Sequence, residues 1–390
     1  MATTASPNTV PGVSILRPLK GLDTNLYENL ESTFQQEYPN FEIIFSVADE
    51  NDQALDVVRE LMRVYPMVDA KISIGEEVVG VNPKVNNLMR PYRNAANDIL
   101  WVIDSGVMAS PGTLARSVDA LGRPSNYMLG SGKRIGVVHH VPFAHVSGAG
   151  YVGSQIEEAF LNTNHAKMYI ALNATAVESC VVGKSNIYRR SDLERVNGSM
   201  KPHADLGAQP DTPLTTRKGL AAFGKYLAED NCIAAAMWHE LDLRHDLSCD
   251  VAHNAVGHMT LADYVWRRVR WIRVRKHMVL AATLLEPFTE SVVAVHFGAF
   301  MWVDLDVYAS LAGYPLPAAS RWRFIGGWIT RELLALPIFM LAIFGNEIVW
   351  RGTTYEVLQN GEAKAVGGRS TSRWWNLRAD DYEPISADPS

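Results

Sequence analysis

The chain has 390 residues, of which 47% are hydrophobic and 20% are charged. This length and apolar content exclude a disordered protein and allow one large domain or two ordinary ones with a sizeable core. Lys and Arg together number 36 against 42 for Asp and Glu, so the formal net charge of -6 does not support a protein that binds nucleic acid through its phosphates. We therefore expect no nucleic acid among its partners.

The three cysteines, Cys180, Cys232 and Cys249, are too few and too widely spaced for a disulfide framework or a zinc site. Their number suits a reducing compartment, and we expect them to be small buried hydrophobic residues. Residues 1–12 are polar and rich in Thr, Ser and Pro. They lack the apolar core of a signal peptide or a spanning helix, and we expect this segment to be disordered.

Short apolar runs alternate with amphipathic stretches from Val13 to about Val141, which is typical of βαβ units. The run Ile99–Ile103 is apolar throughout, as a strand buried on both faces of a parallel sheet must be. The pattern predicts strands at 13–16, 42–48, 70–74 and 99–103, and helices around 26–34 and 55–65. We therefore predict an α/β fold.

The C-terminal part is more apolar and contains two uncharged runs, Val292–Val303 and Leu333–Phe344, the second interrupted by Pro337. Each is shorter than the roughly 20 residues that a spanning helix needs, so spanning, interfacial and buried core helices are all open. The expected organisation is a disordered N-terminus at 1–12, a catalytic domain at 13–276 with a surface insertion at 197–218, membrane-associated helices at 277–350 and a largely disordered tail at 351–390.

Three aspartates directly follow predicted strands: Asp49 and Asp52 follow the second, and Asp104 follows the run Ile99–Ile103. Ligands of open α/β sheets bind at the carboxyl ends of the strands. We expect Asp49 and Asp52 to bind the uridine or ribose of a nucleotide and Asp104 to bind a divalent metal, because Mg²⁺ and Mn²⁺ prefer oxygen ligands. The alternative is that these residues are helix caps and turn formers.

The segment Gly80–Leu88 contains an Asn-Pro turn at a predicted helix start, with Lys84 and Asn87 close behind it. Pro at the start of a helix leaves backbone amides free to bind an anion, and the polar side chains add further donors. The turn can therefore hold part of a nucleotide, although Asn-Pro is also a common way to begin any helix.

Asp230 precedes the Ala-rich run Ile233–Trp238, which is predicted to be helical and buried. A carboxylate at the mouth of a buried helix can take the proton of an acceptor hydroxyl when the geometry allows it. The competing interpretation is that Asp230 is the N-cap of this helix.

A basic and aromatic run begins with Arg267-Arg268-Val269-Arg270-Trp271 and continues to Lys276. Arginine can bind a diphosphate with two parallel hydrogen bonds, and tryptophan can stack on a sugar or line a channel for an acyl chain. The same residues would also suit an amphipathic helix at an anionic membrane surface.

Taken together, these segments resemble the ceramide glucosyltransferase family, whose members are inverting enzymes of the GT-A fold. The resemblance covers 13 to about 352. It is carried by five motifs in order, Val13–Gly21, Asn82–Met89, Trp101–Gly106, Tyr226–Asp230 and Arg267-x-x-Arg270-Trp271, with a further match at Trp350–Gly352. It implies a GT-A nucleotide-diphospho-sugar transferase fold followed by a C-terminal membrane-associated helical region.

The resemblance also implies roles for single positions. Asp52 and Asp104 match the first two aspartates of the family's donor site, and Asp230 matches the third, which is taken as the catalytic base. The remaining matches are Arg267, Arg270 and Trp271 in the signature, His165 as a donor-site histidine and Cys180 as a neighbouring cysteine. The implied reaction joins UDP-glucose to ceramide, giving glucosylceramide and UDP at the cytosolic face of the Golgi or a related endomembrane.

The chain departs from the family pattern in ways that leave alternatives open. The family usually begins with a spanning helix, so membrane anchoring is expected here from the C-terminal part. Asp104-Ser105-Gly106 lacks the second acid of an Asp-x-Asp motif, so a metal would depend on one carboxylate, phosphates and water. A processive polysaccharide synthase of the same fold and an inactive lipid-binding homologue are the alternative functions.

Overall fold

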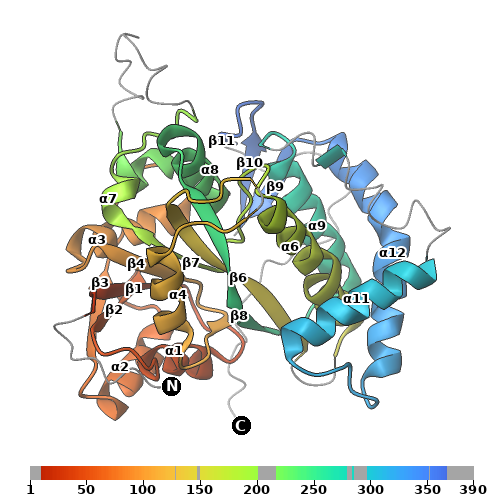
Figure 1. The fold of residues 1–390 in the computed structure, drawn as a ribbon, viewed down its shortest axis with the longest axis horizontal. Coiled ribbons are helices and arrows are strands. Elements are labelled where there is room, and N and C mark those ends of the chain that lie inside the picture. Colours follow the sequence, from red (N-terminus) through yellow and green to blue (C-terminus); the bar gives the residue numbers. More distant parts are fainter. Residues whose placement is uncertain are drawn as a thin grey trace. The chain divides into compact units, whose positions relative to one another are not determined.

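The computed structural model in Figure 1 describes residues 10–127, 129–146, 150–200, 217–278, 283–284, 297–350 and 352–366. The chain folds into two compact units. Unit 1 comprises Met1–Pro142 and Met168–Asn254, and unit 2 comprises Phe143–Lys167 and Ala255–Ser390. Most of the expected N-terminal segment 1–12 and most of the expected insertion 197–218 lie outside the described residues.

Unit 1 is built on a mixed sheet whose eight strands, counted over the described residues, have the order β3-β2-β1-β4-β7-β6-β8-β5. The strands are β1 (Val13–Pro18), β2 (Phe41–Val47), β3 (Asp69–Ile74), β4 (Ile99–Ile103), β5 (Val107–Met108), β6 (Ile135–Val146), β7 (Ser185–Arg189) and β8 (Arg244–Val256). β1 is parallel to β2 and β4, whereas β7 is antiparallel to both β4 and β6. The four strands predicted from the sequence are confirmed as β1 to β4.

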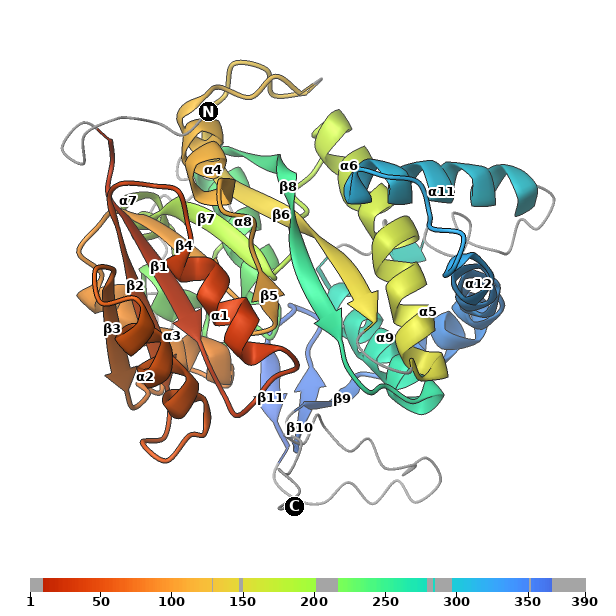
Figure 2. The same ribbon diagram turned by 90° about the horizontal axis from the view of Figure 1, so that it is seen from below.

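The helices of unit 1 follow the predicted periodicity. In α1 the residues Leu26, Leu30 and Phe34 are buried, and this spacing places them on one face of the helix. Figure 2 shows α1 and α2 beside the parallel strands. The helices are α1 (Leu26–Phe34), α2 (Ala54–Val64), α3 (Pro83–Asn94), α4 (Thr113–Gly122), α6 (Ala166–Thr175), α7 (Arg190–Leu193), a 3₁₀ helix (Gly219–Phe223) and α8 (Glu229–Leu241).

The core of the sheet is organised around Trp101 at the centre of β4. Its side chain is fully buried, and its indole N–H donates to Ser185 Oγ of β7 at 2.8 Å. Ile15 of β1 and Ile187 of β7 pack in the same core. The run Ile99–Ile103 is buried along its whole length, as predicted.

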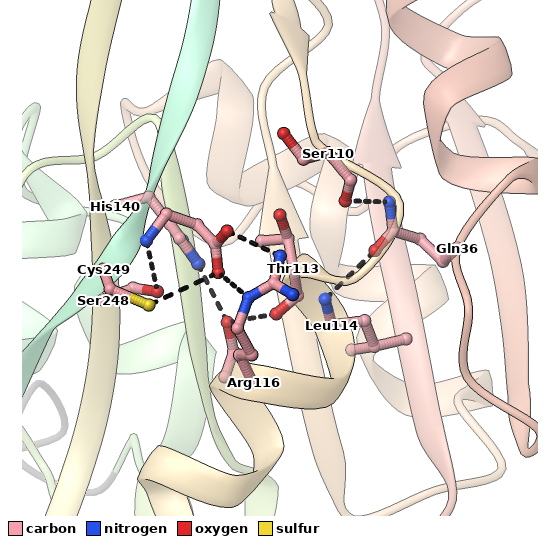
Figure 3. A network of polar contacts seen from close by, with 10 residues as sticks. Gln36, Ser110, Thr113, Leu114, Arg116, His140, Ser248 and Cys249 are labelled. Carbon is pink, nitrogen blue, oxygen red and sulfur yellow. Dashed lines mark hydrogen bonds and ion pairs between the residues drawn. The ribbon is translucent and has the colours of Figure 1, made fainter. Parts of the chain in front are cut away.

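A network of polar contacts fastens α4 to the sheet (Figure 3). Arg116 of α4 forms a two-pronged ion pair with Asp250 of β8, with both N–O distances at 2.7 Å. Ser117 Oγ lies 2.9 Å from Nε2 of the buried His140 on β6. Gln36 accepts from the backbone N–H of Leu114 at the start of α4. These contacts fix the first half of α4 to β6, to β8 and to Gln36.

Unit 2 contains helices that pack on one another and a small sheet (Figure 2). Its elements are α5 (Val152–Phe160), a π-helical turn (Leu161–His165), α9 (Leu261–Arg275), α11 (Phe297–Ala312), α12 (Arg321–Ile343), β9 (Glu347–Trp350), β10 (Thr353–Val357) and β11 (Ala363–Ala365). Helices α5, α9 and α12 pack together, so 143–167 and 255–276 belong with the C-terminal helices. The predicted catalytic domain at 13–276 therefore differs from unit 1.

Two sequence-based expectations are corrected in the described residues. The tail predicted at 351–390 is not disordered throughout, because β10 and β11 pair with β9 in an antiparallel sheet, while 367–390 lies outside the described residues. Burial was expected for all three cysteines, but Cys249 is exposed. It lies in the middle of β8, where the neighbouring residues are only half-buried.

Helix α12 contains the predicted apolar run Leu333–Phe344 except for its last residue. Pro337 was expected to interrupt this run, but the helix continues through it. Proline removes one hydrogen bond of the helix, and the packing of α12 on α5 and α9 compensates for that loss. Among the described helices, α12 is the one that is long and apolar enough to cross a membrane, with 23 residues and a mean hydropathy of 1.4.

The basic end of α9 has a structural function inside unit 2. Arg273 donates to the carbonyls of Leu341 and Glu347, and Lys276 donates to those of Ile343 and Gly345. The last carbonyls of a helix have no partners within the helix, and basic side chains can satisfy them. Part of the basic run is therefore used to cap the C-terminus of α12.

Removing the indole at the centre of β4 tests this account of the core. We expect Trp101→Ala to lower the free energy of unfolding by about 3–5 kcal/mol, because it leaves a cavity and removes the hydrogen bond to Ser185. Urea denaturation monitored by tryptophan fluorescence and circular dichroism measures the change. Met67→Ala, at a side chain that is 94% exposed, serves as the control. A loss below about 1 kcal/mol for Trp101→Ala would contradict the assignment.

Candidate active site

A largely buried ammonium group surrounded by carboxylates forms the candidate active site of unit 1. Lys84 Nζ lies 2.8 Å from Asp104 Oδ1 and 3.0 Å from Glu229 Oε1. Asp230 follows directly in the chain, and its charge acts on Lys84. These four residues are called the Lys84 cluster below. Lys84, Glu229 and Asp230 border a small cavity of about 20 Å³, lined also by Leu88, Val102, Val137, Asn186, Tyr188, Leu220 and Ile233.

Asn82 explains how the chain places Lys84 beside Glu229. Its side-chain oxygen accepts from the backbone N–H groups of Lys84 and Val85, so Asn82 is the N-cap of α3, and Pro83 occupies the first helical position. Its amide group donates to Tyr226 O and to Glu229 Oε2, both at 2.8 Å. The side chain of Asn82 therefore caps α3 and also holds the start of α8 in place.

Asp104 and Asp230 both contact Gly183–Lys184, the two residues that precede β7. The N–H of Asp104 donates to the Lys184 carbonyl at 3.0 Å, and Lys84 Nζ donates to the Gly183 carbonyl at 3.4 Å. A Cβ atom on Gly183 would lie only 2.3 Å from Asp230 Oδ2. This position therefore has room only for glycine while Asp230 keeps its place.

The charges of the cluster determine its protonation. Burial alone would lower the pKa of Lys84, but the charges of Asp104, Glu229 and Asp230 outweigh burial and raise it, so the ammonium stays charged. Burial, followed by the charge of Glu229, raises the pKa of Asp230 to about 7, while Lys84 opposes the shift. Asp230 therefore exchanges a proton near neutral pH, which is the property of an effective general base.

The remaining predicted donor residues of unit 1 lie in or contact the segments at the ends of β1 and β2. Asp52 accepts from the backbone N–H groups of Gly21 and Ala54 and so joins the loop after β1 to the start of α2. Asn87 is buried and donates to the carbonyls of Leu19 and Ser46. Asp49 is exposed and accepts from Asn51. The N-cap of α2 is Gln53, so the alternative interpretation of Asp52 as an N-cap is not borne out, and the donor role of Asp52 stays a prediction.

The alternative interpretation of Asp230 as an N-cap is wrong. The N-cap of α8 is Ala228, and Asp230 is the second residue of the helix. Asp230 is thus available for another role. Sequence reasoning missed Glu229, although it is adjacent to Asp230 and the acidic pair was visible. Consecutive residues at a helix start are about 100° apart around the axis, so both carboxylates can face Lys84.

Four predicted residues belong to unit 2 and gather around α9. Arg267 forms a 2.9 Å ion pair with the buried Glu157, and its guanidinium stacks over Trp271 at 4.8 Å. The His165 ring lies 5.5 Å from that of Trp271. Arg270 is half-buried on the same helix. The contact with Glu157 gives Arg267 a structural role, and the diphosphate, acceptor and donor roles of these residues stay predictions.

The predicted metal site at Asp104 offers one carboxylate that is partly exposed. Within the described parts of the chain, no group of three or more His, Cys, Asp or Glu residues is placed to hold a metal ion. The Asp104 side chain is 29% exposed, and one of its oxygens binds Lys84. Asp104 therefore fits a cation that takes most of its ligands from phosphates and water, as Mg²⁺ commonly does.

This fold and site define a glycosyltransferase of the GT-A class: parallel β1 to β4 continue into antiparallel strands, and carboxylates gather after β4 and at the start of α8. The sequence profile of glycosyl transferase family 21 matches residues 1–206 and 212–363. The chain belongs to this family. The predicted fold class and the predicted family are both confirmed.

Several relatives share most of the chain. The ceramide glucosyltransferase of Komagataella phaffii is 36% identical over 430 residues, covering 90% of this chain and 83% of the relative. The ceramide glucosyltransferase of Candida albicans is 32% identical, covering 91% and 88%. Among solved structures, a mannosyltransferase from Pyrobaculum calidifontis in complex with GDP-Man and Mn²⁺ is 16% identical with a TM-score of 0.45, covering 87% of this chain and 89% of that one.

The close approach of Gly183 to Asp230 can be tested by adding one methyl group. We expect Gly183→Ala to lower turnover in glycosyl transfer about 10- to 100-fold, because the new Cβ displaces the Asp230 carboxylate. The matched control is Gly122→Ala at the end of α4, where a Cβ meets no atom within 4 Å. Thermal melting verifies that both variants are folded. Equal turnover of the two variants would show that Gly183 does not define the position of Asp230.

Proposed function

We propose that this glycosyltransferase moves glucose from UDP-glucose to the primary hydroxyl of ceramide and releases UDP and glucosylceramide. The names of the family 21 relatives support the choice of donor sugar and acceptor. The single observation that carries the proposal is the Lys84 cluster, in which Asp230 combines a raised pKa with a place beside a charged ammonium.

In the proposed reaction, Asp230 accepts the proton of the ceramide hydroxyl as the hydroxyl oxygen attacks the anomeric carbon of glucose. The bond from that carbon to the UDP oxygen breaks in the same displacement, so the α-linked donor becomes a β-glucoside. A pKa near 7 makes Asp230 a stronger base than an ordinary carboxylate, while about half of it is ionised at neutral pH.

The other residues of the cluster hold Asp230 in its charged surroundings. Lys84 balances part of the negative charge of Asp104 and Glu229, and Asn82 keeps Glu229 in place. If a divalent cation binds, Asp104 would contribute one carboxylate, and Mg²⁺ or Mn²⁺ would neutralise the charge of the diphosphate. We further propose Asp49, Asp52, Asn87 and His165 for the donor, and Arg267, Arg270 and Trp271 for the diphosphate and acceptor.

We propose that the apolar face of α12 lies against the bilayer that contains the ceramide. Trp322 and Leu333 on this helix, and Phe344 directly after it, are 80%, 72% and 82% exposed. On the other face, the charge of Arg331 is buried and paired with Asp304 at 3.2 Å. Apart from the exposed Arg321 and Arg323 in its first turn, the helix presents apolar side chains outward and keeps its charges buried in unit 2, which suits contact with a membrane.

For location, we propose the Golgi or a related endomembrane, with the catalytic part facing the cytosol. All three cysteines are unpaired, which supports a reducing compartment for unit 1. A cytosolic orientation would give the site access to nucleotide sugars while α12 contacts lipid.

The proposed reaction can be tested with full-length protein in detergent, labelled UDP-glucose and ceramide. A glucosylated lipid supports the proposal, a polymer identifies a processive synthase, and the lack of any product favours an inactive homologue. We expect Asp230→Asn to lower turnover by about 10²- to 10⁴-fold without weakening the binding of UDP-glucose, because only the base is removed. Asp56→Asn, at a side chain that is 87% exposed on α2, is the matched control.

The pH profile provides a second measurement on the same residue. Asp230 acts in its deprotonated form, so turnover should rise about tenfold per pH unit below pH 7 and become constant above it. Turnover that is independent of pH between 5 and 8 would remove Asp230 from the role of base, as would full activity of Asp230→Asn.

The membrane contact can be tested by placing charges on the exposed face of α12. We expect Leu333→Asp combined with Phe344→Asp to reduce binding of the protein to ceramide-containing phospholipid vesicles by at least about tenfold, because charges are costly in the bilayer interior. Vesicle flotation measures the bound fraction. The control carries the same number of charges at exposed apolar positions of unit 1, Met67→Asp and Val78→Asp. Unchanged binding of the α12 variant would contradict the proposed orientation.

A further inference from the structure

The segment Cys180–Lys184 contacts the Lys84 cluster, and it also contacts two buried histidines that are not part of that cluster. His139 of β6 is fully buried, and His245 of β8 is 3% exposed. Their rings lie 5.7 Å apart and are perpendicular. Neither residue was selected by the sequence analysis, and neither takes part in the mechanism above.

Each of the two rings accepts a backbone hydrogen bond from this segment. The N–H of Cys180 donates to His245 Nε2 at 3.0 Å, and the N–H of Val182 donates to His139 Nδ1 at 3.3 Å. Cys180 and Val182 belong to no strand, so no sheet partner accepts their N–H groups. Buried N–H groups require acceptors, and the histidines provide them.

The side chain of Asn173 on α6 fixes which ring nitrogen carries the proton. Its amide group donates to the Tyr169 carbonyl at 2.9 Å, so its oxygen is the atom that faces the two rings. This oxygen lies 2.9 Å from His245 Nδ1 and 3.4 Å from His139 Nε2. An oxygen can only accept, so these two nitrogens carry hydrogen, and the opposite nitrogen of each ring keeps the lone pair that binds the segment.

The burial of the two rings keeps both imidazoles neutral, as acceptors of a hydrogen bond must be. Burial, followed by the charge of the neighbouring His245, lowers the pKa of His139 well below its ordinary value. Burial, followed by the charge of Arg244, lowers the pKa of His245 to about 4. Both imidazoles are therefore neutral at physiological pH and can act as acceptors.

The opposite side of the same segment contacts the Lys84 cluster. The Gly183 carbonyl accepts from Lys84, the Lys184 carbonyl accepts from the N–H of Asp104, and Gly183 lies against the Asp230 carboxylate. A displacement of the segment would therefore change the surroundings of the base and of its ammonium partner together.

We propose that His139 and His245 are positioning residues for glycosyl transfer, which hold Cys180–Lys184 from behind so that Gly183 and Lys184 fix Lys84, Asp104 and Asp230. The inference rests on the proposed function, because it takes Asp230 as the base. His139 and His245 are far apart in the sequence, and both act on the site only through the backbone of Cys180–Lys184.

The test compares replacements that keep or remove the acceptor. In His245→Gln the side-chain oxygen can take the place of Nε2, and in His139→Asn it can take the place of Nδ1; His245→Leu and His139→Leu provide no acceptor. We expect each Leu variant to lose about 10- to 100-fold in kcat with little change in the KM for UDP-glucose, and each amide variant to recover most of kcat. The pKa seen in the kcat profile should shift in the Leu variants only.

Leu61→Ala on α2, at a fully buried position, is the control for lost stability alone. It should lower the melting temperature while kcat per folded molecule and the pH profile stay at wild-type values. Leu variants that behave like Leu61→Ala would overturn the inference, and so would amide variants as inactive as the Leu variants. If His245→Leu does not fold, the His139 pair answers the same question. Wild-type protein assayed in the same series distinguishes a failure of the proposed function from a failure of the positioning role. An inactive wild type would overturn the proposed function itself.

Discussion

The site depends on one buried ammonium group. Lys84 lies in contact with Asp104 and Glu229, with Asp230 close by, and three carboxylates face a single positive charge. Without Lys84 the carboxylates would repel one another in surroundings that screen charge poorly. With it, Asp104 and Glu229 are held by ion pairs. Burial, followed by the negative charge of Glu229, raises the pKa of Asp230, and Lys84 limits that rise. Burial and the charges of the cluster together thus give the base its strength.

Short backbone contacts hold these charges in place. Asn82 begins α3 and also binds Glu229, and Gly80 lies so close to Gly224 that a Cβ atom on it would be 2.1 Å from the Gly224 carbonyl oxygen. Gly183 leaves the space that Asp230 occupies. Substituting any of these uncharged residues would move charged groups, so the chemistry of the site depends on positions that carry no reactive atoms.

The sequence was sufficient for β1 to β4, because alternating patterns place residues locally. It also indicated Asp104 at a strand end and Lys84 at a helix start as site residues, while the role of Asp230 as the base came from the family resemblance. It was not sufficient for Glu229 or for the two histidines behind Cys180–Lys184, which acquire their roles from contacts between segments far apart in the chain. It also could not separate the arginines of α9: only the folded unit 2 shows Arg267 paired with Glu157 and Arg273 bound to the end of α12.

The binding of Arg273 and Lys276 to the last carbonyls of α12 has a mechanical consequence. Arg273 is in the helix that carries Arg267, Arg270 and Trp271, and Lys276 directly follows it, so α9 and α12 are joined where both helices end. The helix that bears Arg270 and Trp271 is therefore anchored to the helix whose exposed apolar side chains are proposed to contact lipid. A substitution that removes these hydrogen bonds would loosen both helices together.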